Sequence, residues 1–258
     1  MNKAAHEAKV NLSWVNDNPE YVAALNDFVA RILTPSSAGR RNLFLTRLEE
    51  FVRPVVFFGA MNSLAQVLLK ITSPGVPDFY QGNELWELRL VDPDNRHPVD
   101  FALRERMLHD LLQQAEGGGL AELCSDLLAN YHDGRIKMWI TMRALRLRRE
   151  LLDLFRFGSC IPLSSGTEKQ EHLIAFARFY EDHMALIAVP RFTCTLMRGR
   201  VQPPIGEAWG NAELQLPPET TGARLLNLFT GDVHTANGRS LPCRELFAHL
   251  PVALLTTH

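Results

Sequence analysis

The chain has 258 residues, of which 46% are hydrophobic and 22% are charged, a balance typical of globular proteins with one large or two modest cores. Its formal net charge of -2 excludes the strongly basic surface that gathers nucleic acid or an anionic membrane. We therefore expect neither of these as a partner.

Cysteine spacing and the N-terminus bear on redox state and location. There is no Cys-x-x-Cys pair and no histidine at zinc-site spacing, so we expect no metal and four reduced, packed thiols, at Cys124, Cys160, Cys194 and Cys243. The N-terminus lacks the apolar core of a signal peptide. No stretch is expected to approach the length of a membrane span, which favours the cytoplasm.

The first predicted element is an amphipathic helix over residues 18–34. Asn18 is a typical N-cap, Pro19 suits the first helical position, and Glu20 places a negative charge in the first turn. We interpret this helix as a packing element without chemistry of its own.

Two further helices are expected before residue 72. The first begins near Asn42 and runs toward Val52, where Pro54 should break or kink it, and the second covers residues 56–71. The second is almost wholly apolar, which predicts a core helix.

Turn-forming, charged and aromatic residues crowd the stretch 72–100. Functional groups concentrate on loops carried by a rigid scaffold, so we expect this loop to hold side chains for binding. The alternative is a rigid connector, because proline and glycine also stiffen loops. Its first part, residues 75–80, is short enough to form one buried strand.

Residues 100–157 are expected to be helical. Gly117 to Gly119 form a flexible point that separates two helices, and a long amphipathic helix follows over residues 136–157. Its four arginines predict a solvated or ion-paired face, with a sugar or phosphate contact as the alternative: Arg143, Arg146, Arg148 and Arg149.

The hydrophobic period changes from helical to two at about residue 160. Residues 172–180 and 184–189 flank Glu181-Asp182-His183, which predicts a β-hairpin. Short apolar runs separated by prolines and glycines follow at 213–216, 224–229 and 252–255. We expect a small antiparallel β domain, a sandwich.

The central loop also carries a family resemblance. Residues 75–84, Gly-Val-Pro-Asp-Phe-Tyr-Gln-Gly-Asn-Glu, resemble the Gly-x-Pro-x-x-Tyr-x-Gly-x-Glu segment at the eighth barrel strand of the α-amylase family. The continuation resembles one branch of that family, the maltooligosyltrehalose synthases, through Glu84-Leu85-Trp86 and residues 90–100. Nearly the whole chain takes part in the resemblance, with further matches at residues 7–9, 13–14, 133–141, 143–150, 227–231 and 245–247.

The resemblance implies an α/β plus all-β fold. Residues 1–158 would be the terminal part of a (β/α)8 barrel with helical elements, and residues 159–258 the antiparallel β-sandwich domain. In such barrels, sites lie at the C-terminal ends of the strands. The order of a helix, a strand and a polar loop suits the last barrel repeat.

The family consists of isomerases, (1→4)-α-D-glucan 1-α-D-glucosylmutases. They convert the reducing-end α-1,4 bond of a maltooligosaccharide into an α,α-1,1 bond by intramolecular transglucosylation, without a cofactor. A retaining mechanism needs two carboxyl groups about 5 to 5.5 Å apart. None of the three family segments that carry catalytic carboxylates is found here, so we expect the chain alone to be inactive and to need the N-terminal barrel portion.

The loop residues are expected to contact the maltooligosaccharide instead. Aromatic rings stack on the apolar face of a sugar, and amides, carboxylates and guanidinium groups bind hydroxyls. The candidates are Tyr80, Gln81, Glu84, Trp86, Asp92, Asp94, Asn95 and Arg96. For each, loop architecture is the alternative, and Asp92 with Arg96 should form a bidentate pair.

Three alternatives to the enzyme hypothesis stay open. The acids of the loop could supply a substitute catalytic pair, although Arg89 and Arg96 are the expected ion-pair partners. The chain could be a non-catalytic subunit that binds maltooligosaccharide or complements another chain. It could also be a helical protein that binds a partner through exposed apolar faces, which predicts self-association.

Overall fold

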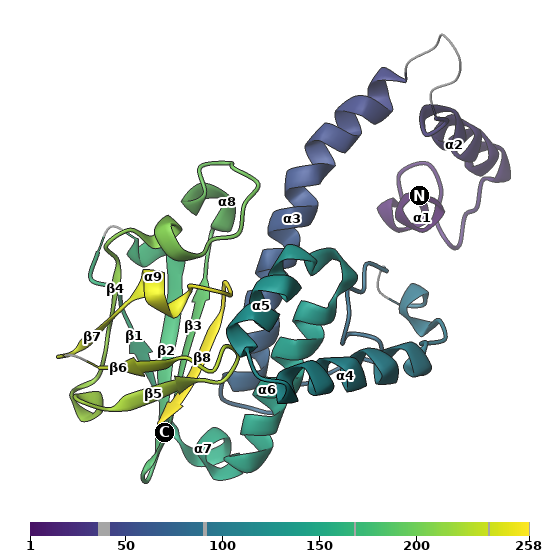
Figure 1. Ribbon diagram of the computed structural model, residues 1–258. Coiled ribbons are helices and arrows are strands. Elements are labelled where there is room, and N and C mark those ends of the chain that lie inside the picture. Colours follow the sequence, from purple (N-terminus) through teal and green to yellow (C-terminus); the bar gives the residue numbers. More distant parts are fainter. Residues whose placement is uncertain (36–41, 90–91, 168, 237, 258) are drawn as a thin grey trace. The chain divides into compact units, whose positions relative to one another are not determined.

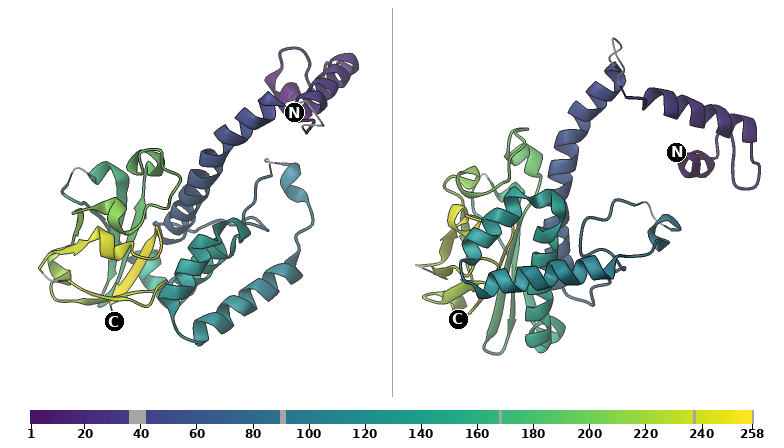
Figure 2. Two further views of the ribbon diagram at one scale, coloured as in Figure 1. Left: turned by 45° about the horizontal axis from the view of Figure 1, so that its top comes forward. Right: turned by 45° about the vertical axis from the view of Figure 1, so that its right-hand side comes forward.

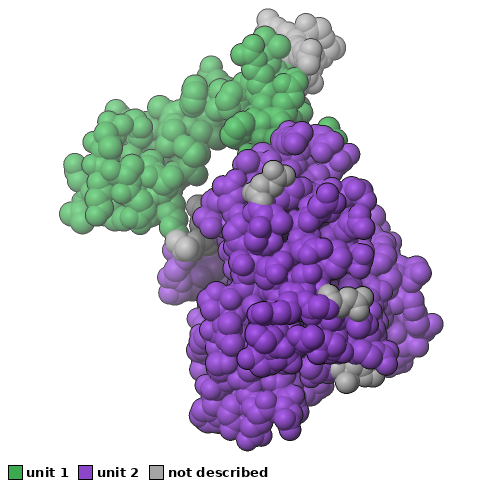
Figure 3. Space-filling view, turned by 90° about the vertical axis from the view of Figure 1, so that its left-hand side faces the viewer, with its two compact units in different colours: residues 1–56 green, residues 57–258 purple. Residues whose placement is uncertain are grey.

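A computed structural model describes residues 1–35, 42–89, 92–167, 169–236 and 238–257. The chain divides into two compact units, residues 1–56 and 57–258 (Figure 3). The division that we predict from the sequence, at 158/159, stays a prediction, although the change from helices to strands does fall at that point.

The first unit is helical and contains α1 (Asn2–Ala8), α2 (Pro19–Ile32) and the beginning of α3. The predicted start of α2 is confirmed, because the Asn18 side chain accepts a hydrogen bond from the Tyr21 backbone N–H at 3.0 Å. Before α2, Trp14 stacks on His6 with ring centroids 4.3 Å apart and donates to Glu7 at 2.9 Å.

Helix α3 (Leu43–Thr72) is continuous, with Pro54 inside it. Of the two outcomes predicted at Pro54, a break or a kink, the break is therefore wrong. Proline removes one backbone donor from a helix, and that local cost does not end the helix here. From Phe57 onward the same helix is packed into the core of the second unit, where Met61, Leu64 and Leu68 have no exposed surface.

The same helix corrects the expectation about membrane spans. Helix α3 is long and apolar enough to cross a membrane by length and composition alone, with a mean hydropathy of 1.5 over an 18-residue window. Half of that window is buried inside the protein, as it is in the core helix of a globular protein. A single helix of this kind is weak evidence for a membrane.

Four helices follow in the second unit: α4 (Phe101–Glu116), α5 (Leu120–Ala129), α6 (Arg135–Glu150) and α7 (Leu152–Phe157). The predicted break at Gly117 to Gly119 is confirmed, with positive φ angles of 85° at Gly118 and 76° at Gly119. The single helix expected over 136–157 is two helices, because Leu151 leaves the helical conformation at φ -110° and ψ 51°. The single-turn helices between these elements are η1 (Asp94–Arg96) and η2 (Tyr131–Asp133).

The remaining residues form two antiparallel sheets. The larger has the order β1 (Ser159–Leu163), β2 (Leu173–Tyr180), β3 (His183–Pro190), β8 (Ala253–Thr257), β5 (Arg224–Asn227) and β6 (Val233–Thr235). The smaller pairs β4 (Glu213–Gln215) with β7 (Ser240–Pro242). Short helices connect the strands: η3 (Gln170–His172), α8 (Thr193–Leu196), η4 (Gly206–Trp209), η5 (Pro218–Thr220) and α9 (Cys243–Leu246).

The predicted hairpin is confirmed. Strands β2 and β3 pair from Leu173 with Pro190 to Tyr180 with His183, which leaves Glu181 and Asp182 as the turn. The antiparallel arrangement of this half is also as expected. The specific sandwich is not confirmed, since the second sheet has only two strands among the described residues.

Each face of the six-stranded sheet is covered by a different core. Along β3, Ala185, Ile187 and Val189 belong to the cluster built by the helices, whereas Met184 and Leu186 belong to a second cluster with β4, β7 and α9. This alternation follows from the two-residue period of a strand. Figures 1 and 2 show α3 and α6 together on one side of the sheet.

The strand predicted over residues 75–80 is absent. This segment is irregular in the structure, and Val76 is 94% exposed. A strand requires hydrogen-bonding neighbours for its backbone groups, and in the part of the chain that the structure describes no strand pairs with these residues.

Two of the four thiols are packed as expected. Cys124 and Cys243 are buried, and burial raises the pKa of each to about 12. Cys160 and Cys194 are free but exposed, which corrects the prediction that all four are packed.

Candidate functional site

The central loop, residues 73–100, is held to α4 by Arg104. The Arg104 guanidinium donates from Nε to Glu84 Oε2 at 3.0 Å, from Nη2 to the carbonyl oxygen of Gly82 at 3.0 Å and from Nη1 to that of Asp100 at 3.1 Å. One side chain therefore fixes two points of the loop and its exit. Helix α4 starts at that exit, where Asp100 caps the Leu103 backbone N–H at 2.8 Å.

A second anchor connects the loop to the start of α6. The indole of Trp86 donates to the Tyr131 carbonyl oxygen at 2.7 Å, and Lys137 Nζ donates to that of Leu85 at 3.1 Å. Burial lowers the pKa of Lys137, and the nearby charge of Lys70 lowers it further. Gly134 lies against Leu85 at a φ of 84°, where a β-carbon would meet the Leu85 side chain at 3.1 Å.

A pocket of about 510 Å³ opens on the loop, and we call it the loop pocket. It is lined by Trp86, Glu87, Leu88, Arg89, Pro98, Val99, Asp100 and Arg104. Glu87 accepts from the Arg89 backbone N–H at 2.9 Å and pairs with its guanidinium at 3.4 Å. An aromatic ring beside carboxylates and guanidinium groups is a suitable surface for a sugar ring and its hydroxyls.

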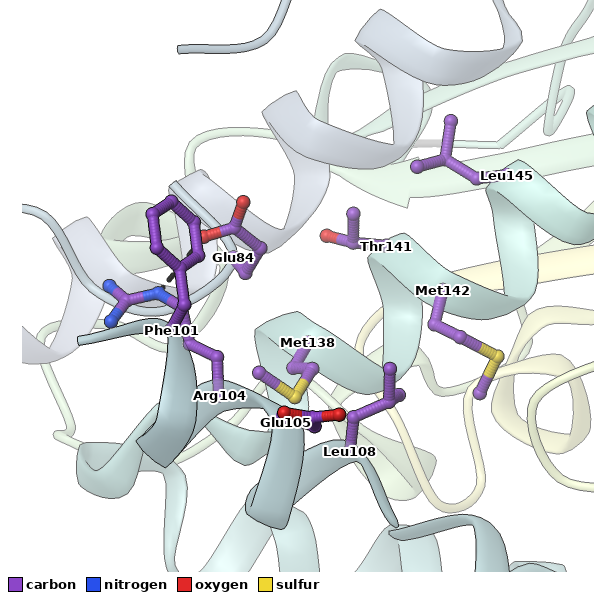
Figure 4. Close-up of a pocket in the computed structure, with 9 residues that line it drawn as sticks. All are labelled: Glu84, Phe101, Arg104, Glu105, Leu108, Met138, Thr141, Met142 and Leu145. Atoms are coloured by element: carbon purple, nitrogen blue, oxygen red, sulfur yellow. Dashed lines mark hydrogen bonds and ion pairs between the residues drawn. The ribbon is translucent and has the colours of Figure 1, made fainter. Parts of the chain in front are cut away.

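A second pocket, of about 480 Å³, lies between α4 and α6 (Figure 4). Its walls are mainly apolar: Glu84, Phe101, Arg104, Glu105, Leu108, Met138, Thr141, Met142 and Leu145. The Glu84–Arg104 ion pair, drawn as a dashed line in Figure 4, belongs to this pocket, and Arg104 also lines the loop pocket. The two pockets therefore share one guanidinium group.

The structure brings few of the predicted binding residues together. Trp86 lines the loop pocket and Glu84 lines the pocket between α4 and α6. Tyr80 is 46% exposed and Gln81 is also exposed, and neither belongs to either lining. Leu90 and Val91, which take part in the family resemblance, lie outside the described residues.

The remaining candidates lie at the short helix η1. The predicted bidentate pair is confirmed, with Arg96 donating from Nη2 to Asp92 at 2.7 Å and from Nε to the other carboxylate oxygen. This pair raises the pKa of Arg96. Asp94 and Asn95 are half-buried, and the buried Asn95 Oδ1 has no hydrogen-bond partner among the described residues. None of the four lines either pocket, and their contact with a sugar stays a prediction.

Several acids of the loop are ion-paired with arginine. Arg89 and Arg96 are the partners predicted from the sequence, and they hold Glu87 and Asp92. Arg104, which holds Glu84, was missed, because it lies 20 residues away on the next helix and only the tertiary fold makes it a neighbour.

The arginine-rich helix requires a correction. Arg148 is 9% exposed and donates to the carbonyl oxygens of Ile71, at 2.6 Å, and Gly75, so it caps the end of α3 and the start of the loop. Arg143 donates to the Leu228 carbonyl oxygen at 2.8 Å. Neither is a solvated or ion-paired side chain, because each guanidinium satisfies carbonyl groups.

Among the described residues, no group of three histidine, cysteine or acidic side chains is placed to hold a metal ion. The loop pocket brings an aromatic ring, carboxylates and guanidinium groups together.

Comparison with known proteins gives relatives over nearly the whole chain. No profile of a known protein family matches. A protein of Mycobacterium tuberculosis (strain CDC 1551 / Oshkosh), named "Putative maltooligosyl trehalose synthase", is 31% identical over 253 residues, which are 98% of this chain and 27% of that protein. The chain thus spans about a quarter of that relative.

Solved structures of similar enzymes also superpose on nearly all of this chain. Maltooligosyltrehalose synthase from Arthrobacter ramosus superposes on all of this chain with a TM-score of 0.75 and 30% sequence identity, over 29% of that enzyme. A structure described as DSM5389 glycosyltrehalose synthase gives a TM-score of 0.63 at 27% identity, over 99% of this chain and 28% of that one.

Proposed function

The chain corresponds to a C-terminal portion of maltooligosyltrehalose synthases, and from this relationship we propose that it supplies part of the sugar-binding surface for the reaction of such an enzyme. That reaction converts the reducing-end α-1,4 bond of a maltooligosaccharide into an α,α-1,1 bond. The observation that carries the proposal is the similarity over nearly the entire chain, in sequence and in fold. The same relationship supports a cytoplasmic location.

The loop pocket is the proposed contact surface for the maltooligosaccharide. The Trp86 ring offers an apolar face to a sugar ring, and its own N–H is already used by the Tyr131 carbonyl oxygen, which holds the ring in place. Glu87 and Asp100 are acceptors for sugar hydroxyls, and Arg89 and Arg104 are donors. Hydroxyl groups that pair with these side chains would distinguish the substrate from apolar ligands.

Catalytic carboxylates are proposed to come from a different part of the enzyme. A retaining mechanism needs one carboxyl group protonated and the other ionised. In the loop, Glu84, Glu87 and Asp92 are each paired with an arginine, and ion-paired carboxylates are more often structural than catalytic. We therefore propose that the N-terminal barrel portion is the second partner of this chain, beside the sugar.

A second candidate function is a non-catalytic subunit that binds maltooligosaccharide. The loop pocket favours it, because ion pairs hold its polar side chains in place before a ligand binds. Both functions use the loop pocket, so they differ in turnover and not in binding.

The test measures the loss of reducing ends when the purified chain is incubated with maltopentaose, alone and together with the N-terminal barrel portion of a relative. We expect no turnover by the chain alone and turnover on complementation. Turnover by the chain alone would contradict the proposal and assign catalysis to the acids of the loop. Binding of maltopentaose without turnover in either mixture would favour the binding subunit.

A point variant tests the pocket itself. Glu87→Gln keeps the size of the side chain and removes its charge and its pairing with Arg89, so we expect maltopentaose binding to weaken by about tenfold in calorimetry. Glu219→Gln, at an exposed position outside the pocket, is the matched control and should leave binding unchanged. Equal affinities for the two variants would rule out the loop pocket as the sugar site.

A further inference from the structure

A pocket of about 480 Å³ that is rich in cations lies beside the six-stranded sheet and shares no residue with the loop pocket. Three segments form it: the chain around η3, the turn after α8, and η4. Its polar lining consists of Lys169, His172, Thr195, Arg198, Arg200 and Glu207.

The charge of this pocket differs from that of the whole chain. Three side chains that are cationic at neutral pH face a single carboxylate, although the formal net charge of the protein is -2. Within the described ranges, neither arginine nor Lys169 has a carboxylate within ion-pair distance. Cations that outnumber the carboxylates in a concave surface create a positive potential that attracts an anion.

Hydrogen bonds fix the backbone of the pocket. Lys169 Nζ donates to the Ala208 carbonyl oxygen and so connects the first and third segments. His172 is buried, with Nδ1 3.2 Å from the Arg191 carbonyl oxygen, and the Arg191 N–H donates to the carbonyl oxygen of His172 at 2.7 Å. These contacts hold the floor of the pocket in place before any ligand binds.

The turn after α8 carries both arginines. Its backbone closes through the Arg198 N–H, which donates to Thr195 at 3.0 Å, and the Gly199 N–H, which donates to Cys194 at 2.9 Å. Arg198 has a left-handed φ of 53°, and Arg200 donates from Nε to the Met197 carbonyl oxygen at 3.3 Å. Both side chains are exposed, and the terminal nitrogens of Arg200 have no hydrogen-bond partner among the residues that the structure describes.

We propose that this pocket binds the phosphate group of a small hydroxylated phosphate ester. Arg198 and Arg200 would bind the phosphate oxygens, since guanidinium groups form strong, geometrically specific pairs with phosphate, and Lys169 adds positive charge. The volume is larger than a phosphate alone requires, and Glu207 and Thr195 are placed to bind hydroxyls of the rest of the ligand. This site does not depend on the proposed function, because it shares no residue with the sugar pocket.

The test is calorimetry on the full chain at low salt with three probes: glucose 6-phosphate, inorganic phosphate and glucose. We expect saturable binding of glucose 6-phosphate, weaker binding of inorganic phosphate and none of glucose, with all phosphate binding weakened by added salt. Equal affinity for inorganic phosphate and the ester would overturn the hydroxyl-binding half of the proposal. Absence of saturable binding for both phosphate probes up to about 10 mM would overturn all of it.

Variants test whether glucose 6-phosphate binds in this pocket. The double variant Arg198→Gln with Arg200→Gln should weaken glucose 6-phosphate binding by at least about tenfold, because it removes two charge-assisted contacts. The matched control is Arg224→Gln, an exposed arginine on β5 outside the pocket, which should bind like the unaltered chain. If circular dichroism shows an intact fold and the double variant binds glucose 6-phosphate with unchanged affinity, the phosphate binds outside this pocket and the proposal is wrong.

Discussion

Arg178 shows how a single buried residue connects several elements. It is 1% exposed, and its guanidinium donates to five carbonyl oxygens, at 2.9 to 3.2 Å, belonging to Thr72, Leu154, Phe155, Gly158 and Ser159. These groups end α3 and α7 and begin β1. Burial lowers the pKa of Arg178, and the positive end of the side chain is stabilised by carbonyl dipoles at the helix C-termini.

We expect Arg178→Ala to lower the free energy of unfolding by about 3 kcal/mol, because it leaves buried carbonyl groups without donors and opens a cavity. Arg178→Lys should lower the free energy of unfolding by less than Arg178→Ala does, since lysine keeps the charge and three of the hydrogen-bond donors. Urea unfolding measures both. Arg224→Ala, at an exposed position, should change stability by less than about 0.5 kcal/mol, and a similar value for Arg178→Ala would contradict the role assigned to the buried guanidinium.

At the scale of elements, the contact between η2, the start of α6 and the central loop decides where Trp86 lies. Gly134 has a positive φ and contacts Leu85, so Gly134→Ala combines backbone strain with a steric clash. Gly222→Ala is the matched control, because Gly222 has a φ of 77° and open space where the β-carbon would lie. We expect Gly134→Ala to be more destabilising than the control by about 1 kcal/mol.

Hydrogen exchange provides the local readout for that prediction. The backbone amides around Leu85 and Trp86 should exchange faster in Gly134→Ala than in Gly222→Ala, because the clash displaces the segment that Lys137 and Tyr131 hold. Equal exchange in both variants would show that Gly134 does not position the loop.

At the scale of the whole molecule, exposed apolar side chains predict self-association of the isolated chain. In the unit formed by residues 57–258, Val76 is 94% exposed, Leu88 is 88% exposed and Phe101 is 58% exposed. Burying such side chains is favourable wherever a partner surface is available. We therefore expect the apparent molar mass from light scattering to rise with protein concentration.

The double variant Val76→Ser with Leu88→Ser should reduce that association, whereas Val201→Ser, at a less exposed position, should not. A monomer at every concentration tested would contradict the prediction. If the N-terminal barrel portion covers the same residues, adding it should abolish the association as well, which connects this measurement to the complementation assay.

Local features could be predicted from the amino-acid sequence. The start of α2 at Asn18, the break at Gly118 and Gly119, and the turn at Glu181 depend on groups a few residues apart, so backbone chemistry is enough to predict them. The same is true of the Asp92–Arg96 pair, whose members are four residues apart. The family resemblance is also read from the chain alone, and the relatives support it.

Contacts between distant residues depend on the folded structure and could not be predicted from the sequence. Pro54 remains inside a helix whose later turns are buried in the core, so packing outweighs the local cost. Residues 75–80 have no strand paired with them in the described part of the chain and stay irregular. Arg104, Arg148 and Lys137 find partners 20 to 77 residues away, and no pattern of spacing identifies them. Local preferences determine where elements begin and end, but the burial of polar groups is settled by the completed fold.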